Sequence, residues 1–413
     1  RLPAWFATIG IVWLTWCLAN HARGAAVARW STLVLSTMAL TYISAGAVMT
    51  DTFLVFGTTL SLVSMWFVLS GRSDYWRWWF FVGLAIGLLS KGPLAVVLTV
   101  TPLVLWAAIF RQQLQPLKKL PWLLGSLLTL AIAVPWYVLA ELKTPGFLNY
   151  FIIGEHFSRF LYPEWAGDLY GSAHDRPKGM IWIFWLWASF PWGIIGLVGF
   201  GLAAARGKTK DIFTGAVQDA STLYLLFCAI TPMLFFTLAG NTLWTYILPS
   251  LPFSAILIAG WVSQLNLRPW SRIRSGAVLL APVLITLFVF IGVSGVKPLK
   301  TEKQLIGRYE SIQQAGDGPI FYIGKMPFSA RFYSLGDAVE ITSTEFDSLL
   351  DADGYARVFA AIPNDAVDKV LGPRATDAQK LGENKRYQLF SIDLPPTDSQ
   401  NDPVDSELNS KND

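Results

Sequence analysis

The chain has 413 residues, of which 53% are hydrophobic and only 15% are charged, and its net charge is +4. Soluble domains usually have about a quarter of their residues charged, so this composition does not fit a soluble protein. The small positive charge is typical of a basic membrane-facing surface, and we expect membrane lipids and no nucleic acid among the partners.

Long apolar stretches recur through the first 300 residues. A helix needs about 20 apolar residues to cross the hydrocarbon core of a bilayer. Continuous runs of this kind exclude the alternative, a closed barrel of short alternating strands. The sequence therefore predicts an all-α polytopic membrane protein with about ten spans, at residues 4–19, 30–50, 52–70, 76–90, 93–110, 121–140, 180–203, 220–240, 245–264 and 275–294.

The lysines and arginines between these spans are distributed unevenly. One set of alternating loops holds thirteen of them and the opposite set holds five. Basic loops stay in the cytoplasm, so the second set faces the other side of the membrane. This orientation places Asp51, Lys91, the 141–179 loop, Asn241 and the C-terminal region together on the outer face.

Two charged residues lie at the ends of apolar runs. Asp51 lies in SAGAVMTDTFLVF, where a carboxylate near hydrocarbon is costly and is normally kept for a site or a partner. An N-cap for a helix that starts at residue 52 is the structural alternative. Lys91 lies in GLLSKGPLAVV at the outer interface, where an ammonium could hold a lipid phosphate or could simply mark a helix end.

The 141–179 loop contains an amphipathic, aromatic stretch, NYFIIGEHFSRFLYPEW, that predicts a helix lying in the membrane interface. Glu155 and His156 in this stretch could bind a divalent ion such as zinc or magnesium. The alternative is a surface ion pair between Glu155 and Arg159, which are one helical turn apart.

The segment AGNTLWTYILPSLPF brings Asn241 and Tyr246 to the outer face. The Tyr246 hydroxyl could contact a phosphate or a sugar, although aromatic residues also gather at membrane interfaces for packing alone. The chain has no glycine loop for nucleotide phosphates, so we expect no nucleotide cofactor. An activated donor on this side would need a lipid anchor.

After residue 295 the composition changes. Residues 301–316 predict a polar helix, and residues 318–324, 331–336, 339–342, 357–362 and 387–392 predict short strands. We expect domain boundaries at 1–295 for the transmembrane part, 296–393 for a small α/β domain outside the membrane, and 394–413 for a disordered tail rich in Pro, Asp, Ser and Asn.

The order of these segments resembles the membrane glycosyltransferases of the aminoarabinose transferase type, which are related to the protein O-mannosyltransferases and have the GT-C fold. The matching pieces are RLPA at 1–4, MTDTFL around Asp51, GLAIGLLSKGP at 84–93, PWYVLAELKTPGFLNYFIIGEHFSRF at 135–160 and TYILPSLPF at 245–253.

The resemblance implies transfer of a sugar from an undecaprenyl-phosphate carrier to a lipid A-like or other envelope acceptor, at the periplasmic face of a bacterial inner membrane. It assigns Asp51 to the acidic residue of an outer helical hairpin, Lys91 and Tyr246 to the carrier phosphate, and His156 to a metal ligand. Arg159 and Asn241 are further candidates for binding the donor. The family's main catalytic Asp would lie in a loop that precedes RLPA.

Three other functions stay open from the sequence. A transporter or flippase of lipid-linked intermediates would show internal repeats and interrupted helices at the membrane midplane. A protein O-glycosyltransferase would use the same donor with a protein acceptor. A structural subunit would depend on residues 297–393 and tolerate loss of Asp51 and Lys91.

Overall fold

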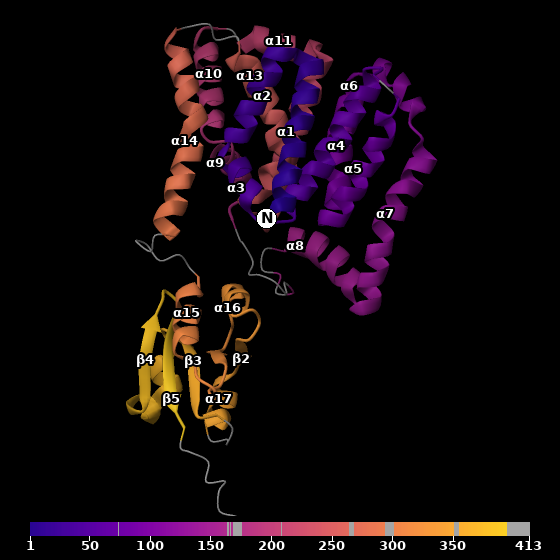
Figure 1. The fold of residues 1–413 in the computed structure, drawn as a ribbon. Helices are drawn as coiled ribbons and strands as arrows, with labels where there is room; N and C mark the ends of the chain where they lie inside the picture. Colours follow the sequence, from indigo (N-terminus) through magenta and orange to yellow (C-terminus); the bar gives the residue numbers. More distant parts are fainter. Residues whose placement is uncertain are drawn as a thin grey trace, which may run out of the picture. The chain divides into compact units, whose positions relative to one another are not determined.

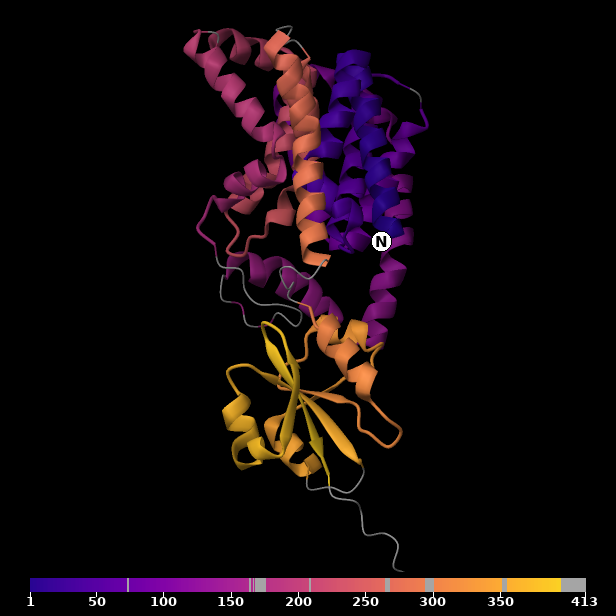
Figure 2. The ribbon, with the colours of Figure 1, turned by 60° about the vertical axis from the view of Figure 1, so that its left-hand side comes forward.

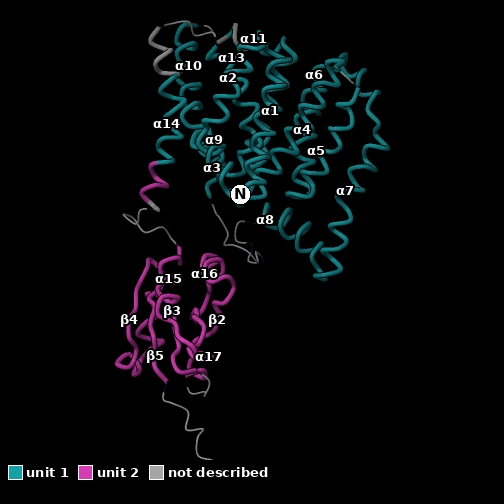
Figure 3. Tube along the Cα trace, viewed as in Figure 1, with its two compact units in different colours: residues 1–286 teal, residues 287–413 magenta. Residues whose placement is uncertain are grey.

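The structure, a computed structural model, describes residues 1–72, 74–162, 165, 167, 176–207, 209–263, 268–293, 301–350 and 355–394. It divides into two compact units, residues 1–286 and 287–413 (Figure 3). This boundary falls inside the last helix of the first unit, whereas the predicted boundary at residue 295 lies outside the described residues. The residues beyond Thr286 in that helix are largely exposed and so contribute little to the packing of the first unit.

Unit 1 is helical throughout (Figure 1). Its elements are α1 (Leu2–Arg23), α2 (Ala25–Thr37), α3 (Ala39–Gly46), α4 (Asp51–Leu69), α5 (Trp76–Lys91), α6 (Leu94–Ile109), η1 (Arg111–Gln113), η2 (Gln115–Lys119), α7 (Trp122–Lys143), η3 (Asn149–Ser158), α8 (Arg159–Leu161), α9 (Met180–Ala188), α10 (Trp192–Ala205), α11 (Thr209–Gln218), α12 (Ala220–Thr237), η4 (Trp244–Ser250), α13 (Leu251–Val262) and α14 (Arg268–Val293).

All ten predicted stretches are helical. In the described residues, five helices are long and apolar enough to cross a membrane, or up to seven if each of two sharply bent pairs counts as one span. The predicted number of ten spans therefore stays a prediction. The predicted span 180–203 is one of the bent pairs, because α9 and α10 meet at an angle of 108° near Pro191. The predicted span 30–50 is also interrupted, because Met38 has an extended backbone between α2 and α3.

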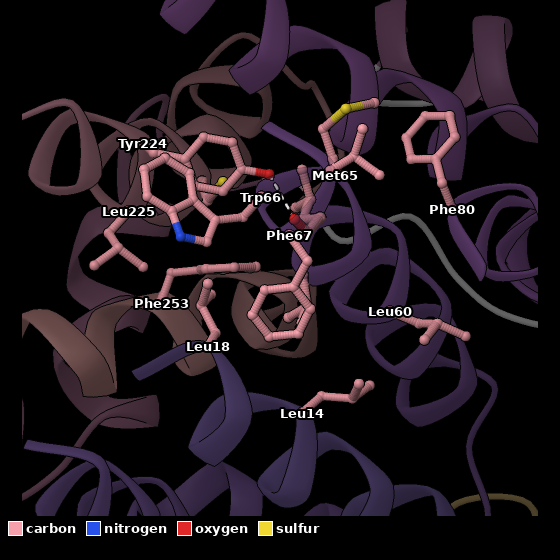
Figure 4. Packing of buried hydrophobic residues seen from close by; sticks show 14 of the residues in the cluster. Leu14, Leu18, Leu60, Met65, Trp66, Phe67, Phe80, Tyr224, Leu225 and Phe253 are labelled. Carbon is pink, nitrogen blue, oxygen red and sulfur yellow. Dashed lines mark hydrogen bonds between the residues drawn. The ribbon is translucent and has the colours of Figure 1, made fainter. Parts of the chain in front are cut away.

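The core of unit 1 surrounds α4, most of which is buried. Large side chains from α1, α4, α5, α12 and α13 interlock there, among them Leu18, Trp66, Phe80 and Phe253 (Figure 4). The buried Tyr224 hydroxyl donates a 2.6 Å hydrogen bond to the Leu62 carbonyl, so its polar end is satisfied inside the core.

Helices α4 and α5 approach each other closely because glycines line their contact. A Cβ atom at Gly57 would lie 2.6 Å from the Gly83 carbonyl oxygen and 2.7 Å from the Gly87 nitrogen. Small residues one turn apart let two helices in a membrane pack backbone to backbone. This packing brings the start of α4 beside the end of α5, and with them Asp51 and Lys91.

Unit 2 is an α/β domain with a five-stranded sheet in the order β2-β1-β3-β5-β4 (Figure 2). Strand β1 pairs in parallel with β2 and β3, whereas β5 pairs antiparallel with β3 and β4. The elements are α15 (Lys303–Ile312), β1 (Ile320–Ile323), α16 (Phe328–Tyr333), β2 (Val339–Ile341), α17 (Ser343–Leu350), β3 (Arg357–Pro363), α18 (Val367–Leu371), η5 (Gly372–Thr376), β4 (Ala378–Glu383) and β5 (Tyr387–Asp393).

Both faces of this sheet are covered. Tyr322 and Phe359 pack with α15 and α16 on one face, and Phe321 and Ile362 pack with α17 and α18 on the other. Strands buried on both faces read as continuous apolar runs, which is why β1 and β3 could be predicted from the sequence.

One prediction for this domain was wrong, and one strand was missed. Residues 331–336 were expected to form a strand but lie in α16 and the turn after it. The helix begins directly after Pro327, and Ala330 is its buried residue. Strand β4 was not predicted, because its sequence, AQKLGE, is polar and it lies at the edge of the sheet. The predicted tail is outside the described residues, apart from Leu394.

Candidate site at one end of the helical unit

Asp51 and Lys91 form an ion pair. Lys91 Nζ lies 3.1 Å from Asp51 Oδ1, and their side chains are only 25% and 12% exposed. Asp51 is the first residue of α4, Thr50 is its N-cap, and no side chain caps the helix. The alternative of an N-cap role for Asp51 is therefore wrong, and the partner of this carboxylate is an ammonium ion.

Tyr246 lies on the other side of the same ammonium. Lys91 Nζ is 5.2 Å from the centre of the Tyr246 ring, which is within the range of a cation–π contact. The Tyr246 ring also packs against Phe236 of α12. Three residues that are far apart in sequence and belong to α4, α5 and η4 therefore meet at one ammonium group. The sequence predicted that they lie on one face, and the structure adds the contacts.

His156 contacts the C-terminal end of α5, the helix that carries Lys91. Its Nε2 lies 2.9 Å from the Lys91 carbonyl oxygen and its Nδ1 lies 2.6 Å from the Phe151 carbonyl oxygen. The Tyr137 hydroxyl donates a 2.6 Å hydrogen bond to the Leu88 carbonyl. The last turn of a helix has carbonyl groups without a partner in the helix, and His156 meets that of Lys91. The Leu88 carbonyl also accepts from the Gly92 N–H at 2.8 Å, so the Tyr137 hydroxyl adds a second hydrogen bond there.

The predicted helix is present in this stretch, but its first part is a π-helix, η3, and its place at a membrane interface stays a prediction. The wider turn is visible in the contacts five residues apart, where the Tyr150 hydroxyl donates to Glu155 Oε1 at 2.6 Å and His156 meets the carbonyl of Phe151. The expected ion pair is also present, with Arg159 Nη1 2.8 Å from Glu155 Oε2.

Asn241 is buried in the segment that leads to Tyr246, with 5% of its surface exposed. The neighbouring Gly240 N–H donates a 2.8 Å hydrogen bond to the Phe160 carbonyl, which joins this segment to α8. Tyr246 is within electrostatic range of Arg159 and Glu155 as well as of Lys91 and Asp51. All the residues predicted for the site therefore lie at one end of unit 1, where Figure 1 shows α3, α8 and the C-terminal end of α7.

A cavity of about 370 Å³ opens beside this group. Its walls are mostly aromatic and apolar, with one cation, and are formed by Arg176, Phe184, Trp187, Thr242, Leu243 and Trp244. Sites for organic ligands typically combine such walls with a few polar groups.

The residues expected to bind a metal ion do not fit one in this arrangement. Both ring nitrogens of His156 face carbonyl oxygens, and both oxygens of Glu155 are occupied by Tyr150 and Arg159. No group of three His, Cys, Asp or Glu side chains that could hold a metal ion occurs within the part of the chain that the structure describes. Metal binding would require His156 to leave a backbone carbonyl.

Gly92 makes a close contact with η3 that the sequence analysis missed. Its φ is +57°, and a Cβ atom there would lie 2.8 Å from Phe151 Cε1 and 3.0 Å from His156 Nε2. Only glycine fits both the backbone and the space. The partners are about 60 residues away along the chain, so no local pattern could have revealed this contact.

We expect Gly92→Ala to destabilise the protein by about 1–3 kcal/mol and to displace η3, because it combines backbone strain with a clash. Gly146→Ala is the matched control, since Gly146 also has a positive φ, +89°, but has open space around its Cβ position. Thermal unfolding of both variants measures the difference. Equal destabilisation of the two would show that the approach of η3 to Gly92 is not tight.

The fold and this cluster define a largely helical protein with several helices long and apolar enough to cross a membrane, and with charged and aromatic groups gathered at one end of unit 1. The crystal structure of ArnT from Cupriavidus metallidurans bound to undecaprenyl phosphate has the same fold, with a TM-score of 0.71 at 16% identity over 94% of this chain and 82% of that one. The apo structure of the same protein gives a TM-score of 0.69.

Sequence comparison leads to the same group of proteins. Residues 1–151 match the family of dolichyl-phosphate-mannose-protein mannosyltransferases. The chain is 28% identical over 318 residues to an undecaprenyl phosphate-α-4-amino-4-deoxy-L-arabinose arabinosyl transferase of Pseudomonas fluorescens, which is 74% of this chain and 51% of that protein. A second such transferase of that species is 31% identical over 53% of this chain and 35% of its own length.

The chain thus spans about half or less of the length of these two curated relatives. The resemblance seen in the sequence is confirmed, because the chain is similar to aminoarabinose transferases and shares the fold of ArnT.

Proposed function

We propose that this protein transfers a sugar from a polyprenyl-phosphate donor, such as undecaprenyl-phosphate aminoarabinose, to lipid A or another envelope acceptor. The observation that carries the proposal is the Lys91 ammonium, held between the Asp51 carboxylate and the Tyr246 ring at one end of an apolar helical unit. The names of the relatives supply the donor and the reaction class.

Lys91 and Tyr246 bind the phosphate that leaves. When the acceptor hydroxyl attacks the anomeric carbon, the bond from that carbon to the phosphate oxygen breaks and negative charge grows on the phosphate. An ammonium fixed in a site with little water stabilises this charge without having to reorganise. A single displacement inverts the anomeric carbon, and the acceptor's proton passes to a base.

Asp51 has two roles in this mechanism. One carboxylate oxygen holds Lys91 in place through the 3.1 Å contact. The other can accept a hydrogen bond from the acceptor hydroxyl and orient it for attack. His156 positions Lys91 through the Lys91 carbonyl, while Glu155 fixes Arg159 close to Tyr246. The aromatic cavity beside Thr242 and Trp244 offers a surface for the sugar ring or the acceptor.

The proposed location is a bacterial inner membrane, with the site and unit 2 on the periplasmic side. The uneven distribution of basic residues among the loops supports this orientation. A polyprenyl-linked donor suits the periplasm, because nucleotide sugars are made in the cytoplasm.

The test is reconstitution of the natural full-length protein in proteoliposomes with polyprenyl-phosphate aminoarabinose, lipid A and an acceptor peptide. Mass spectrometry should show the sugar on lipid A. Sugar on the peptide alone would indicate a protein O-glycosyltransferase. Unchanged donor that moves to the other leaflet would indicate a transporter and would overturn the proposal.

A further inference from the structure

Helix α16 of unit 2 carries large apolar side chains on its surface. Phe328 is 70% exposed, Phe332 is 72% exposed, and Leu335 in the following turn is 91% exposed. We call these three residues the α16 patch. Phe328 and Phe332 are one helical turn apart, so they lie on the same face of the helix. The domain's own core buries Ala330 of this helix and packs partly against Tyr333, which leaves the three patch residues uncovered.

The backbone at Leu335 has an unusual conformation. Its φ is +54°, and it is the only residue other than glycine with a positive φ among those that the structure describes. A bulky residue in this conformation is uncommon and costs free energy, so glycine or asparagine would be expected. An exposed leucine at a strained position is consistent with a side chain that has a partner outside the domain.

Two basic residues lie close to the α16 patch in sequence. Lys325 and Arg331 are both exposed, and the segment 325–335, KMPFSARFYSL, contains no acidic residue. Aromatic and aliphatic side chains next to basic ones are typical of segments that lie at the surface of a bilayer, with the rings at the headgroup level and the cations at the lipid phosphates.

The chain also keeps this helix within reach of a membrane. The Glu302 N–H, at the start of α15, donates a 3.3 Å hydrogen bond to Ser329 Oγ of α16, and the two helices pack side by side (Figure 1). Residues 294–302 separate the end of α14 from α15, and nine residues span at most about 30 Å. The exposed apolar side chains along α14, such as Leu284 and Phe288, favour lipid around that helix.

We propose that the α16 patch inserts into the interfacial region of the lipid bilayer, where Lys325 and Arg331 bind the phosphates of anionic lipids. Phe328, Phe332 and Leu335 enter the boundary between headgroups and acyl chains. The contact holds unit 2 against the membrane surface next to its tether. This inference needs only a membrane around unit 1 and is independent of the proposed sugar transfer.

The test uses spin labels on the full chain in nanodiscs that contain phosphatidylglycerol. Phe328→Cys, Phe332→Cys and Leu335→Cys are labelled one at a time in a Cys17→Ser, Cys228→Ser background. We expect these labels to be more accessible to oxygen, which concentrates in lipid, than to a water-soluble nickel complex. Ser348→Cys, on the exposed side of α17, is the control and should show the opposite order.

The lipid dependence tests the role of the cations. Lys325→Gln with Arg331→Gln should increase the nickel accessibility of the label at 332 in phosphatidylglycerol nanodiscs. It should have little effect in phosphatidylcholine nanodiscs. Labels in the patch that behave like the control would overturn the proposal. Labels shielded from both oxygen and nickel in either lipid would also overturn it, because they would show that a protein surface covers the patch.

Discussion

Lys91→Ala is expected to lower the rate of sugar transfer by about two to three orders of magnitude in the full-length protein. Loss of one preorganised group that stabilises charge in a transition state typically has an effect of this size. Lys91→Arg should keep part of the activity, because a guanidinium keeps the charge but not the compact shape of an ammonium. The measurement is the initial rate of product formation in proteoliposomes at matched protein amounts.

Two further variants separate chemistry from folding. Lys143→Ala removes an exposed lysine at the C-terminal end of α7 and should leave the rate unchanged. Asp51→Asn with Lys91→Met removes both charges, so no unpaired buried charge remains to destabilise the fold. This double variant should be stable and inactive. Transfer at the normal rate by a well-folded Lys91→Ala protein would exclude Lys91 from the mechanism.

The second large effect is expected in unit 2, around Glu302. This carboxylate is fully buried, and it accepts hydrogen bonds from Arg386 Nη2 at 2.8 Å and Asn384 Nδ2 at 2.6 Å. Tyr322 lies next to it, and burial first and the charge of Glu302 second raise the pKa of that hydroxyl far above its ordinary value. The hydroxyl therefore stays protonated and can donate to Glu302, as it does at 3.4 Å.

Arg386→Met should destabilise this domain by about 3–5 kcal/mol, because it leaves a buried carboxylate without its counter-charge. The effect of Glu302→Gln should be smaller, since the Arg386 side chain is 36% exposed and can bind water. Hydrogen exchange of the β1 and β3 amides in the full chain measures the free energy of opening of the domain.

The control for this experiment is an exposed ion pair in the same domain. Lys380 Nζ lies 2.6 Å from Glu383 Oε2, with side chains 45% and 62% exposed. Lys380→Met should cost less than about 1 kcal/mol. Glu302→Gln with Arg386→Met should recover much of the loss. If Arg386→Met and Lys380→Met had equal effects, the Glu302 network would not stabilise the domain.

The helical unit was predictable to a large extent, because the signal for a spanning helix is local. Each of the ten predicted stretches contains a helix, and the apolar strands β1 and β3 were found for the same reason. The failures were also local. The aromatic residues of α16 led to a strand prediction because such residues favour sheets in general. Strand β4 was missed because its polar sequence lacks the alternation of apolar and polar residues that indicates a strand.

For the site, the residues were predictable but their contacts were not. Asp51, Lys91 and Tyr246 stand out because charged and hydroxyl groups are rare beside hydrocarbon, and the loop charges placed them on one face. The pairing of Asp51 with Lys91, by contrast, depends on glycine contacts between α4 and α5. No property of either residue's neighbours in sequence encodes that approach.

The sequence alone therefore determined where the apolar helices of unit 1 lie, where the polar residues lie along the chain, and which proteins this one resembles. The tertiary structure decided which of those residues touch: Lys91 with Asp51 and Tyr246, and His156 with the end of α5. The physical reason is the distance along the chain over which each effect acts. Hydrophobic periodicity acts over a few residues, whereas these contacts join positions 40 to 155 residues apart and depend on how whole helices pack.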